Sequence, residues 1–416
     1  MSRVRALLPP RGRSGPWILA LAVALILAFQ PIWADATAVA VVGSIGLTLV
    51  AATRWQLRWL PVIVLILCGL VLRLSVIDRE ASDVADVTRM AILSMIGGDN
   101  PYGVGYWASR PEGAAFPYGP VALLWYLPFR IDPAMLELLV SMALTGYLGI
   151  RAAKGRPIGL AIFALAPPLV LASMDGSNDT SAGLFILGAI AVGSRWPIAG
   201  ASILAIAVAF KPYAVAFLPG FIVWAGLTSL VAFVATSVVA WSPVLFSWGI
   251  DSYLRSLAMA QGTHLRDAYW SLAAVVERIL PGTDARVLET LRYFAAGAVG
   301  VIGALKVRSI DGVIVVGSLA FVIAQFGGYF GSYVYIAAIA PVLCWRVDDW
   351  LQMGLPELVR TDGEAGSART IRRPALAPAL APAPVQPAAA AGRMMGAVRR
   401  AARGRRETRP SRTPTA

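Results

Sequence analysis

The sequence predicts an all-α fold: a polytopic transmembrane helical bundle of about twelve spans, with a long first outer loop carrying short interfacial helices. Hydrophobic residues make up 58% of the 416 residues and charged residues only 14%, and the mean hydropathy is +0.69. Soluble proteins carry about 25% charged residues. Apolar runs of roughly 15–20 residues, close to the length that crosses a bilayer core, recur along most of the chain. A soluble all-α protein is excluded because the chain has too little polar surface to cover these runs.

The orientation of the spans follows from basic clusters, which favour the cytoplasmic side. Arginines within residues 3–13 place the N-terminus inside, and the third span then delivers residues 78–116 to the outside. Counting back from the basic C-terminus, taken as inside, places residues 249–290 and 173–179 outside as well. The candidate spans are 17–33, 37–52, 59–77, 117–130, 133–150, 157–172, 180–194, 197–210, 213–226, 228–248, 291–306, 310–327 and 329–346.

One apolar segment, residues 117–130, does not fit this count. Three candidate spans lie between two outer loops, although an even number is needed. Residues 151–156, "RAAKGR", favour the inside, so 133–150 and 157–172 both span. We infer that the short, proline-bounded segment 117–130 enters the membrane without crossing, or lies along the outer interface, beside a cavity. A miscount of the spans is the alternative.

The C-terminal tail accounts for most of the net charge of +13. From Arg360 onward twelve arginines face three acidic residues, a balance of +9. We therefore expect two parts: a membrane-embedded domain over 1–346 and a disordered cytoplasmic tail over 347–416 that sets topology and binds anionic membrane lipids. A nucleic-acid partner is not expected, because no aromatic residues accompany the arginines.

The outer loop carries two acidic residues at the start of a predicted helix. Ser82 is a plausible N-cap, and Asp83 and Asp86 stand three residues apart on one helix face. Such a carboxylate could act as a general base, which needs a fixed position and a tuned pKa. The alternative is that both residues only stabilise the helix N-terminus.

Aromatic residues are clustered in the same loop, among them Tyr102 and Tyr118. Their turn-rich surroundings, "GGDNPYG" and "FPYGP", predict a conformationally fixed loop. These rings could lie in the interfacial belt or stack against a sugar ring, and the composition favours neither.

A second polar stretch, "SMDGSND", lies at an outer membrane boundary. Asp175, Asn178 and Asp179 are costly there unless they are solvated or functional. We expect them to line a cavity; an ordinary wet loop is the alternative.

Four basic residues are candidates for binding a phosphate on the outer side. Lys211 lies where positive charge is disfavoured and so needs an anionic partner, although it could instead snorkel to lipid headgroups. His264, the only histidine, lies between Arg255 and Arg266 in an outer loop; an ordinary loop position is its alternative. With one histidine and two cysteines inside apolar spans, a zinc site is not expected, and no cofactor is expected either. A divalent ion shared by Asp83 and Asp86 is the alternative.

These motifs together resemble those of GT-C glycosyltransferases, most closely the polyprenol-phosphate-mannose-dependent mannosyltransferases. The resemblance covers roughly residues 60–345 and rests on an early acidic residue, "G-G-D-N-P-Y", "Y-G-P", "G-S-N-D" and "K-P-Y…L-P" in that order. Two departures stand out: the family's usual "Y-P-P" is Tyr118-Gly119-Pro120, and the aromatic residue after its catalytic aspartate is Val84.

The resemblance implies an enzyme of the plasma membrane with both termini cytoplasmic and its active site on the outer face. It would transfer a sugar, mannose before others, from a polyprenyl-phosphate donor to a glycolipid or glycan acceptor, with inversion. Asp83 matches the catalytic aspartate and Asp86 is second, while Lys211 falls at the donor phosphate. Asp175, Asn178 and Asp179 fall where the family places polar groups near the sugar or the acceptor. A secondary transporter, a lipid flippase and a non-catalytic envelope scaffold are the alternatives.

Overall fold

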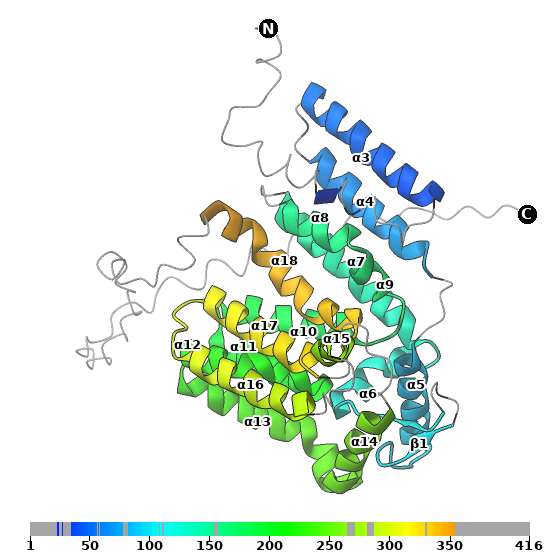
Figure 1. The fold of residues 1–416 in the computed structure, drawn as a ribbon, viewed down its shortest axis with the longest axis vertical. Coiled ribbons are helices and arrows are strands. Elements are labelled where there is room, and N and C mark those ends of the chain that lie inside the picture. Colours follow the sequence, from blue (N-terminus) through cyan, green and yellow to red (C-terminus); the bar gives the residue numbers. More distant parts are fainter. Residues whose placement is uncertain are drawn as a thin grey trace, which may run out of the picture. The chain divides into compact units, whose positions relative to one another are not determined.

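The computed structural model describes residues 23–24, 27, 35–55, 57, 59–77, 82–107, 109, 112–153, 157–263, 271–280, 287–328 and 331–353. Helices dominate this part of the chain, in agreement with the predicted all-α class (Figure 1). The α-helices are α3 (Asp35–Trp55), α4 (Leu60–Leu74), α5 (Asp83–Ile96), α6 (Pro120–Tyr126), α7 (Pro133–Ala152), α8 (Ile158–Leu165), α9 (Pro167–Leu171), α10 (Asp179–Gly193), α11 (Pro197–Phe210), α12 (Leu218–Ala225), α13 (Leu227–Pro243), α14 (Ile250–Thr263), α15 (Leu272–Ile279), α16 (Val287–Ala304), α17 (Ile310–Phe326) and α18 (Ile336–Met353). The short helical turns are η1 (Leu127–Phe129), η2 (Pro212–Phe217), η3 (Val244–Trp248) and η4 (Tyr333–Tyr335).

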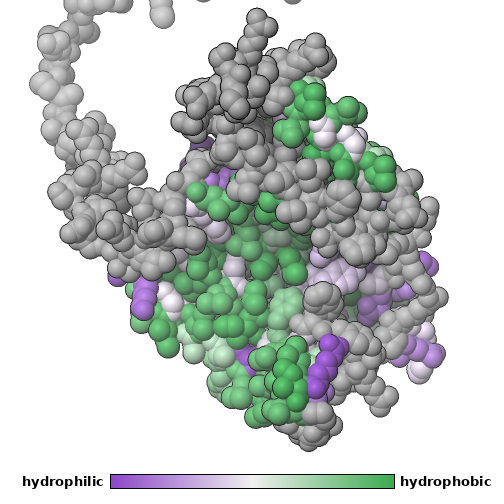
Figure 2. All heavy atoms as spheres, turned by 45° about the horizontal axis from the view of Figure 1, so that its top comes forward, coloured by the Kyte–Doolittle hydropathy of each residue, from purple (hydrophilic) through white to green (hydrophobic). Residues whose placement is uncertain are grey.

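Three helical segments are long and apolar enough to cross a membrane: Pro133–Ala152, Leu227–Trp248 and Val287–Ala304. Seven further apolar helices in the described part have 10–17 residues. In Leu227–Trp248 and Val287–Ala304 only 17% of the apolar window is buried inside the protein. Figure 2 shows a broad hydrophobic area on one face, the kind of surface that lipid covers.

The predicted span 157–172 is broken by a proline pair. Pro167 and Pro168 lack the N–H groups that would bond to the carbonyls of Phe163 and Ala164, so α8 ends and α9 begins as a separate helix. The guanidinium of Arg73 on α4 supplies the missing donors, at 2.9 Å to the Phe163 carbonyl and 3.0 Å to the Ala164 carbonyl. A fully buried arginine thus completes the hydrogen bonding of a broken helix.

The segment 117–130, predicted not to cross, contains α6 and η1, seven and three residues long. Ten helical residues extend about 15 Å, half the thickness of a bilayer core. The segment is joined to the end of α11, because the Gly119 N–H donates to the Phe210 carbonyl at 3.2 Å. A side chain at Gly119 would overlap the Ala209 carbonyl, so this close approach requires glycine.

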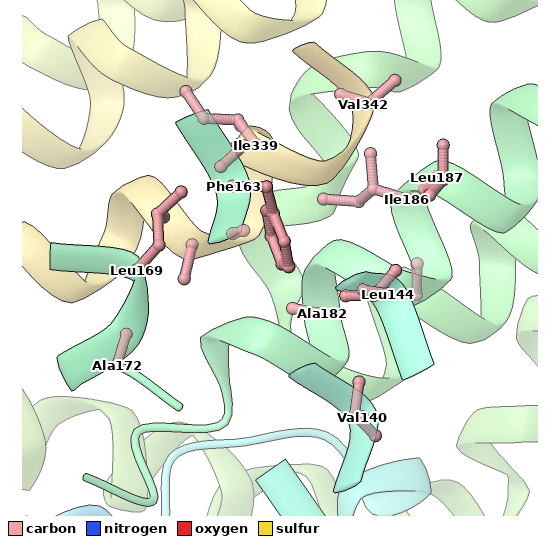
Figure 3. Close-up of a cluster of buried hydrophobic side chains, with 14 of the residues drawn as sticks. Val140, Leu144, Phe163, Leu169, Ala172, Ala182, Ile186, Leu187, Ile339 and Val342 are labelled. Carbon is pink, nitrogen blue, oxygen red and sulfur yellow. The ribbon is translucent and has the colours of Figure 1, made fainter. Parts of the chain in front are cut away.

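The core lies where α7, α8, α10 and α18 meet (Figure 3). Phe163 belongs to this cluster together with Leu144, Ile186 and Val342, which are all buried. Inside a membrane such contacts stabilise through close packing rather than through exclusion of water. A side chain at Gly159 would overlap the Cys344 carbonyl, so a small residue also brings α8 and α18 together.

The last helix continues past the predicted domain boundary at residue 346, since α18 ends at Met353. Asp348 on this extension accepts hydrogen bonds from the N–H groups of Ile158 (2.9 Å) and Gly159 (3.0 Å). It thereby caps the N-terminus of α8. The final turns of α18 are thus bound to the N-terminus of α8.

Candidate functional site

The helix that carries the predicted catalytic aspartates is anchored directly to the second polar stretch. The Ser82 N–H donates to the Asp175 carbonyl at 2.6 Å, immediately before α5 begins at Asp83. Ser82 occupies the N-cap position, as predicted, but its side chain makes no capping hydrogen bond. Gly176 permits close packing here, because a Cβ at this position, with φ +68°, would lie 2.5 Å from the Cβ of Ala85. The N-terminus of α5 and residues 173–179 are therefore joined directly.

Asp83 lines a small open pocket together with Tyr118, Pro117 and the paired-strand residues Ala114 and Ala115. A hairpin pairs β1 (Gly105–Tyr106) with β2 (Ala114–Ala115), an element that the sequence did not predict. Ala260 on α14 also lines the pocket. Asp86 is half-buried in the first turn of α5 and is not among the residues that line this pocket.

Lys211 has an anionic partner within the chain. Its Nζ lies 2.9 Å from Asp179 Oδ1, and both side chains are almost fully buried. The same ammonium donates to the Ser177 carbonyl at 3.0 Å. It also lies 5.1 Å from the ring centroids of Tyr118 and Tyr213, within the range of a cation–π interaction. The expected need for an anionic partner is met by Asp179, without a phosphate.

Pro212 fixes Lys211 in this place. Because Pro212 has no N–H, α11 ends at Phe210 and Lys211 takes an extended backbone conformation that turns its side chain to Asp179. Tyr213 follows on η2, and its hydroxyl donates to Asp179 Oδ1 at 2.5 Å. Asp179 thus accepts hydrogen bonds from two side chains of one short segment, Lys211 and Tyr213.

Asn178 combines backbone strain with unused hydrogen-bonding groups. It is the one non-glycine residue with positive φ, at +60°, among the described residues. Its side chain is fully buried, and neither amide atom has a partner within that part of the chain. Strain and buried unpaired polar atoms cluster at functional sites, because the surrounding structure must maintain them at a free-energy cost.

Asp175 has a perturbed acidity. Removal of water from its carboxyl group, strengthened by the nearby charges of Asp179 and Glu137, raises the pKa of Asp175 to about 7. The Ser177 N–H, which donates to Asp175 Oδ1 at 2.9 Å, opposes this rise. A carboxyl group with such a pKa exchanges protons at neutral pH.

Glu137 was missed by reading the sequence. It is a fully buried acid in α7, and it accepts hydrogen bonds from the Tyr126 hydroxyl at 2.5 Å and from the Ser181 N–H at 3.0 Å. It therefore joins α6, in the segment 117–130, to the first turn of α10, which carries Asp179. Its signal is a single acid in the apolar run "PAMLELLVSMAL", where an ionisable group needs a partner.

The remaining predicted residues lie apart from this cluster or outside the described residues. Tyr102 is 1% exposed, its ring packs against Phe116 and Trp248, and its hydroxyl donates to the Tyr118 carbonyl at 3.1 Å. It supports Tyr118 and presents no free face to a sugar. Arg255 is exposed on α14. His264 and Arg266 lie outside the described residues.

No family model, curated protein or solved structure matches this chain. The site is therefore interpreted from its own chemistry. In the described ranges no three His, Cys, Asp or Glu side chains are close enough to hold a metal ion together. What the site brings together is three aspartates, one buried ammonium group and several tyrosine rings.

Proposed function

We propose that the protein is an integral-membrane glycosyltransferase of the GT-C type, with about twelve spans. It transfers a sugar, mannose before others, from a polyprenyl-phosphate donor to a glycolipid or cell-envelope glycan acceptor. Transfer takes place on the outer face of the plasma membrane, with inversion, while both termini are cytoplasmic. The carrying observation is the hydrogen bond from the Ser82 N–H to the Asp175 carbonyl, which joins the Asp83 pocket to the buried Lys211–Asp179 pair.

Asp83 is the proposed general base, because it lines the pocket and Asp86 does not. A hydroxyl group is a weak nucleophile, so its proton passes to the carboxylate as the new glycosidic bond forms. The bond between the anomeric carbon and the lipid-phosphate oxygen breaks at the same time. The phosphate leaves with the electron pair of that bond.

We assign Lys211 a different role from the contact with the donor phosphate that the sequence suggested. Because it is bound to Asp179 and the Ser177 carbonyl, we assign it to holding residues 177–179 in place. Asp175, Asn178 and Asp179 then face the sugar or the acceptor. Asn178 contributes the unpaired amide, which matches the alternating donors and acceptors of neighbouring hydroxyl groups.

The test is a transfer assay on the purified protein in nanodiscs, with radiolabelled polyprenyl-phosphate-mannose and a crude glycolipid extract. We expect label in a glycolipid with wild type, and a loss of about 10²- to 10⁴-fold with Asp83→Asn. Asp86→Asn is the matched control, since it removes an equal charge from the same helix turn, and it should retain activity. Wild-type turnover by Asp83→Asn would assign the base elsewhere.

A secondary transporter is the second candidate. The observation in its favour is a buried ion pair, Lys211–Asp179, beside discontinuous helices such as α8 and α9, since substrate sites of transporters combine these features. Wild-type protein that neither transfers label nor binds the donor, but exchanges a solute across proteoliposomes, would favour this candidate.

A further inference from the structure

A second basic side chain, Arg292, lies near the outer end of α16 and was not singled out by the sequence. It is 8% exposed, and it forms an ion pair with Glu289 one turn earlier. Its Nη2 also donates to the Tyr293 hydroxyl at 2.8 Å. Its Nε has no partner among the described residues, although it is buried. One nitrogen of the guanidinium edge is therefore unused.

The backbone at Gly327 and Gly328 lies against this guanidinium. A Cβ at Gly327 would lie 2.9 Å from the Cβ of Arg292, and a Cβ at Gly328 would lie 2.7 Å from its Nε. Any larger residue at these two positions would displace the arginine. Glycine at these two positions therefore leaves the space that the Arg292 side chain occupies.

Tyr335 connects Arg292 to the proposed active site. Its ring lies 6.2 Å from that of Tyr213, whose hydroxyl donates to Asp179, and 6.3 Å from that of Phe326, the residue before Gly327. Its ring lies 5.6 Å from the Lys211 ammonium. The region around Tyr335 therefore has an acidic part, toward α10, and a basic part, toward α16.

The helix that carries Arg292 faces lipid along most of its length. Leu291 and Phe294 are 50% and 72% exposed beside the arginine, and Val301 and Ile302 are 58% and 61% exposed further along α16. A cation near the end of an exposed apolar helix is placed like a binding group for a lipid phosphate, with room for the lipid chain below it.

We propose that Arg292 binds the phosphate of the lipid-linked donor; this inference rests on the proposed function. Lys211 cannot do so while it holds Asp179, and the three aspartates repel an anion on their side of Tyr335. The Nε–Nη2 edge of an arginine matches two phosphate oxygens. Glu289, whose side chain is 30% exposed, releases this edge by turning toward water. The donor then lies with its phosphate at α16 and its sugar at Asp83.

The experiment measures ligand binding rather than transfer. Full-length protein in phosphatidylcholine nanodiscs is titrated with a short-chain polyprenyl phosphate and, separately, with polyprenyl-phosphate-mannose. Arg292→Gln should raise both Kd values about tenfold to a hundredfold, because a charge-assisted bond is lost. Arg292→Lys should give Kd values between those of wild type and Arg292→Gln, since it keeps the charge and loses the planar edge. Glu289→Gln should lower both values. Arg308→Gln, an exposed arginine beyond the other end of α16, is the matched control and should change neither.

Several outcomes would overturn the proposal. Unchanged Kd values for a folded Arg292→Gln would do so, as would an equal loss in Glu289→Gln, which would make the ion pair structural. If Arg255→Gln raised the Kd values and Arg292→Gln did not, the phosphate would be assigned to α14. Competition by phosphatidylglycerol as strong as that of the polyprenyl phosphate would assign the arginine to an ordinary headgroup. If wild type binds neither polyprenyl ligand, the proposed function fails as well; if wild type transfers the sugar and Arg292→Gln binds normally, only this inference fails.

Discussion

Two of the buried basic side chains, Arg73 and Lys211, are held in opposite ways. Arg73 is bound by the Ser141 hydroxyl and by backbone carbonyls, and no carboxylate is among its partners in the described residues. Lys211 is bound by the Asp179 carboxylate and surrounded by tyrosine rings. A cation held by carbonyls replaces donors that the backbone lost, so it belongs to the fold. A cation held by a carboxylate forms a pair that a proton or another ion can disrupt, so it belongs to the site.

The largest effect should come from Arg73→Met. It leaves the carbonyls of Phe163 and Ala164 and the Ser141 hydroxyl without donors, and at about 1–2 kcal/mol each the loss of stability is about 3–6 kcal/mol. Thermal unfolding in detergent measures it. Combining Arg73→Met with Pro167→Ala and Pro168→Ala returns the backbone donors, so the combined loss should be smaller than the sum of the parts. Strict additivity would contradict the assigned role of Arg73.

A slightly smaller loss is expected for Lys211→Met. It leaves Asp179 buried without its cation, which costs about 3–5 kcal/mol in comparable pairs. Adding Asp179→Asn removes the unpaired charge and should restore much of the stability, while sugar transfer stays absent. The two readouts, thermal unfolding and transfer, separate the pair's role in the site from its role in the fold. Restored transfer in the double variant would make the pair purely structural.

A pH dependence is expected from Asp175, whose pKa of about 7 in the folded protein lies above its ordinary value of 3.8. Between these values the folded state binds a proton that the unfolded state has lost, so stability falls as the pH rises from about 4 to about 7. The slope from one such group is at most about 1.4 kcal/mol per pH unit. Asp175→Asn should flatten the unfolding profile in that window. An unchanged profile would show that another group titrates.

The smallest effects come from removing one hydroxyl at each cation. Ser141→Ala removes the acceptor that lies 2.7 Å from Arg73 Nε, and Tyr213→Phe removes a donor to Asp179. Each should lower stability by about 1 kcal/mol. Only Tyr213→Phe should change the rate of sugar transfer, which the nanodisc assay measures. An equal loss of transfer in Ser141→Ala would erase the distinction between the two cations.

The gathering of Asp83, Asp175, Asp179 and Lys211 could be expected from the sequence, because span counting put all their segments on one face. The sequence could not predict that Asp179 is the anionic partner of Lys211, because the partner depends on which segments contact each other in the folded protein. Arg73 and Glu137 escaped notice for a related reason. Each is a single charge in an apolar run, and only the packed structure shows which groups satisfy it.

The helix boundaries were predicted less well than the helical class. The predicted span 157–172 is divided at Pro167 and Pro168, and 213–226 is divided between η2 and α12. Prolines mark both breaks in the sequence, but hydropathy averages across them. The number of described helices that are long and apolar enough to cross a membrane is therefore smaller than the number of apolar runs.

The close approach at Gly119 has a consequence for sequence change. Proline there, which would give this chain the "Y-P-P" of the family it resembles, would remove the N–H that Phe210 accepts and put ring atoms on the Ala209 carbonyl. A chain with proline at this position must hold the two segments further apart. We therefore expect Gly119→Pro alone to destabilise this chain, because the segments around Gly119 and Ala209 would have to move apart.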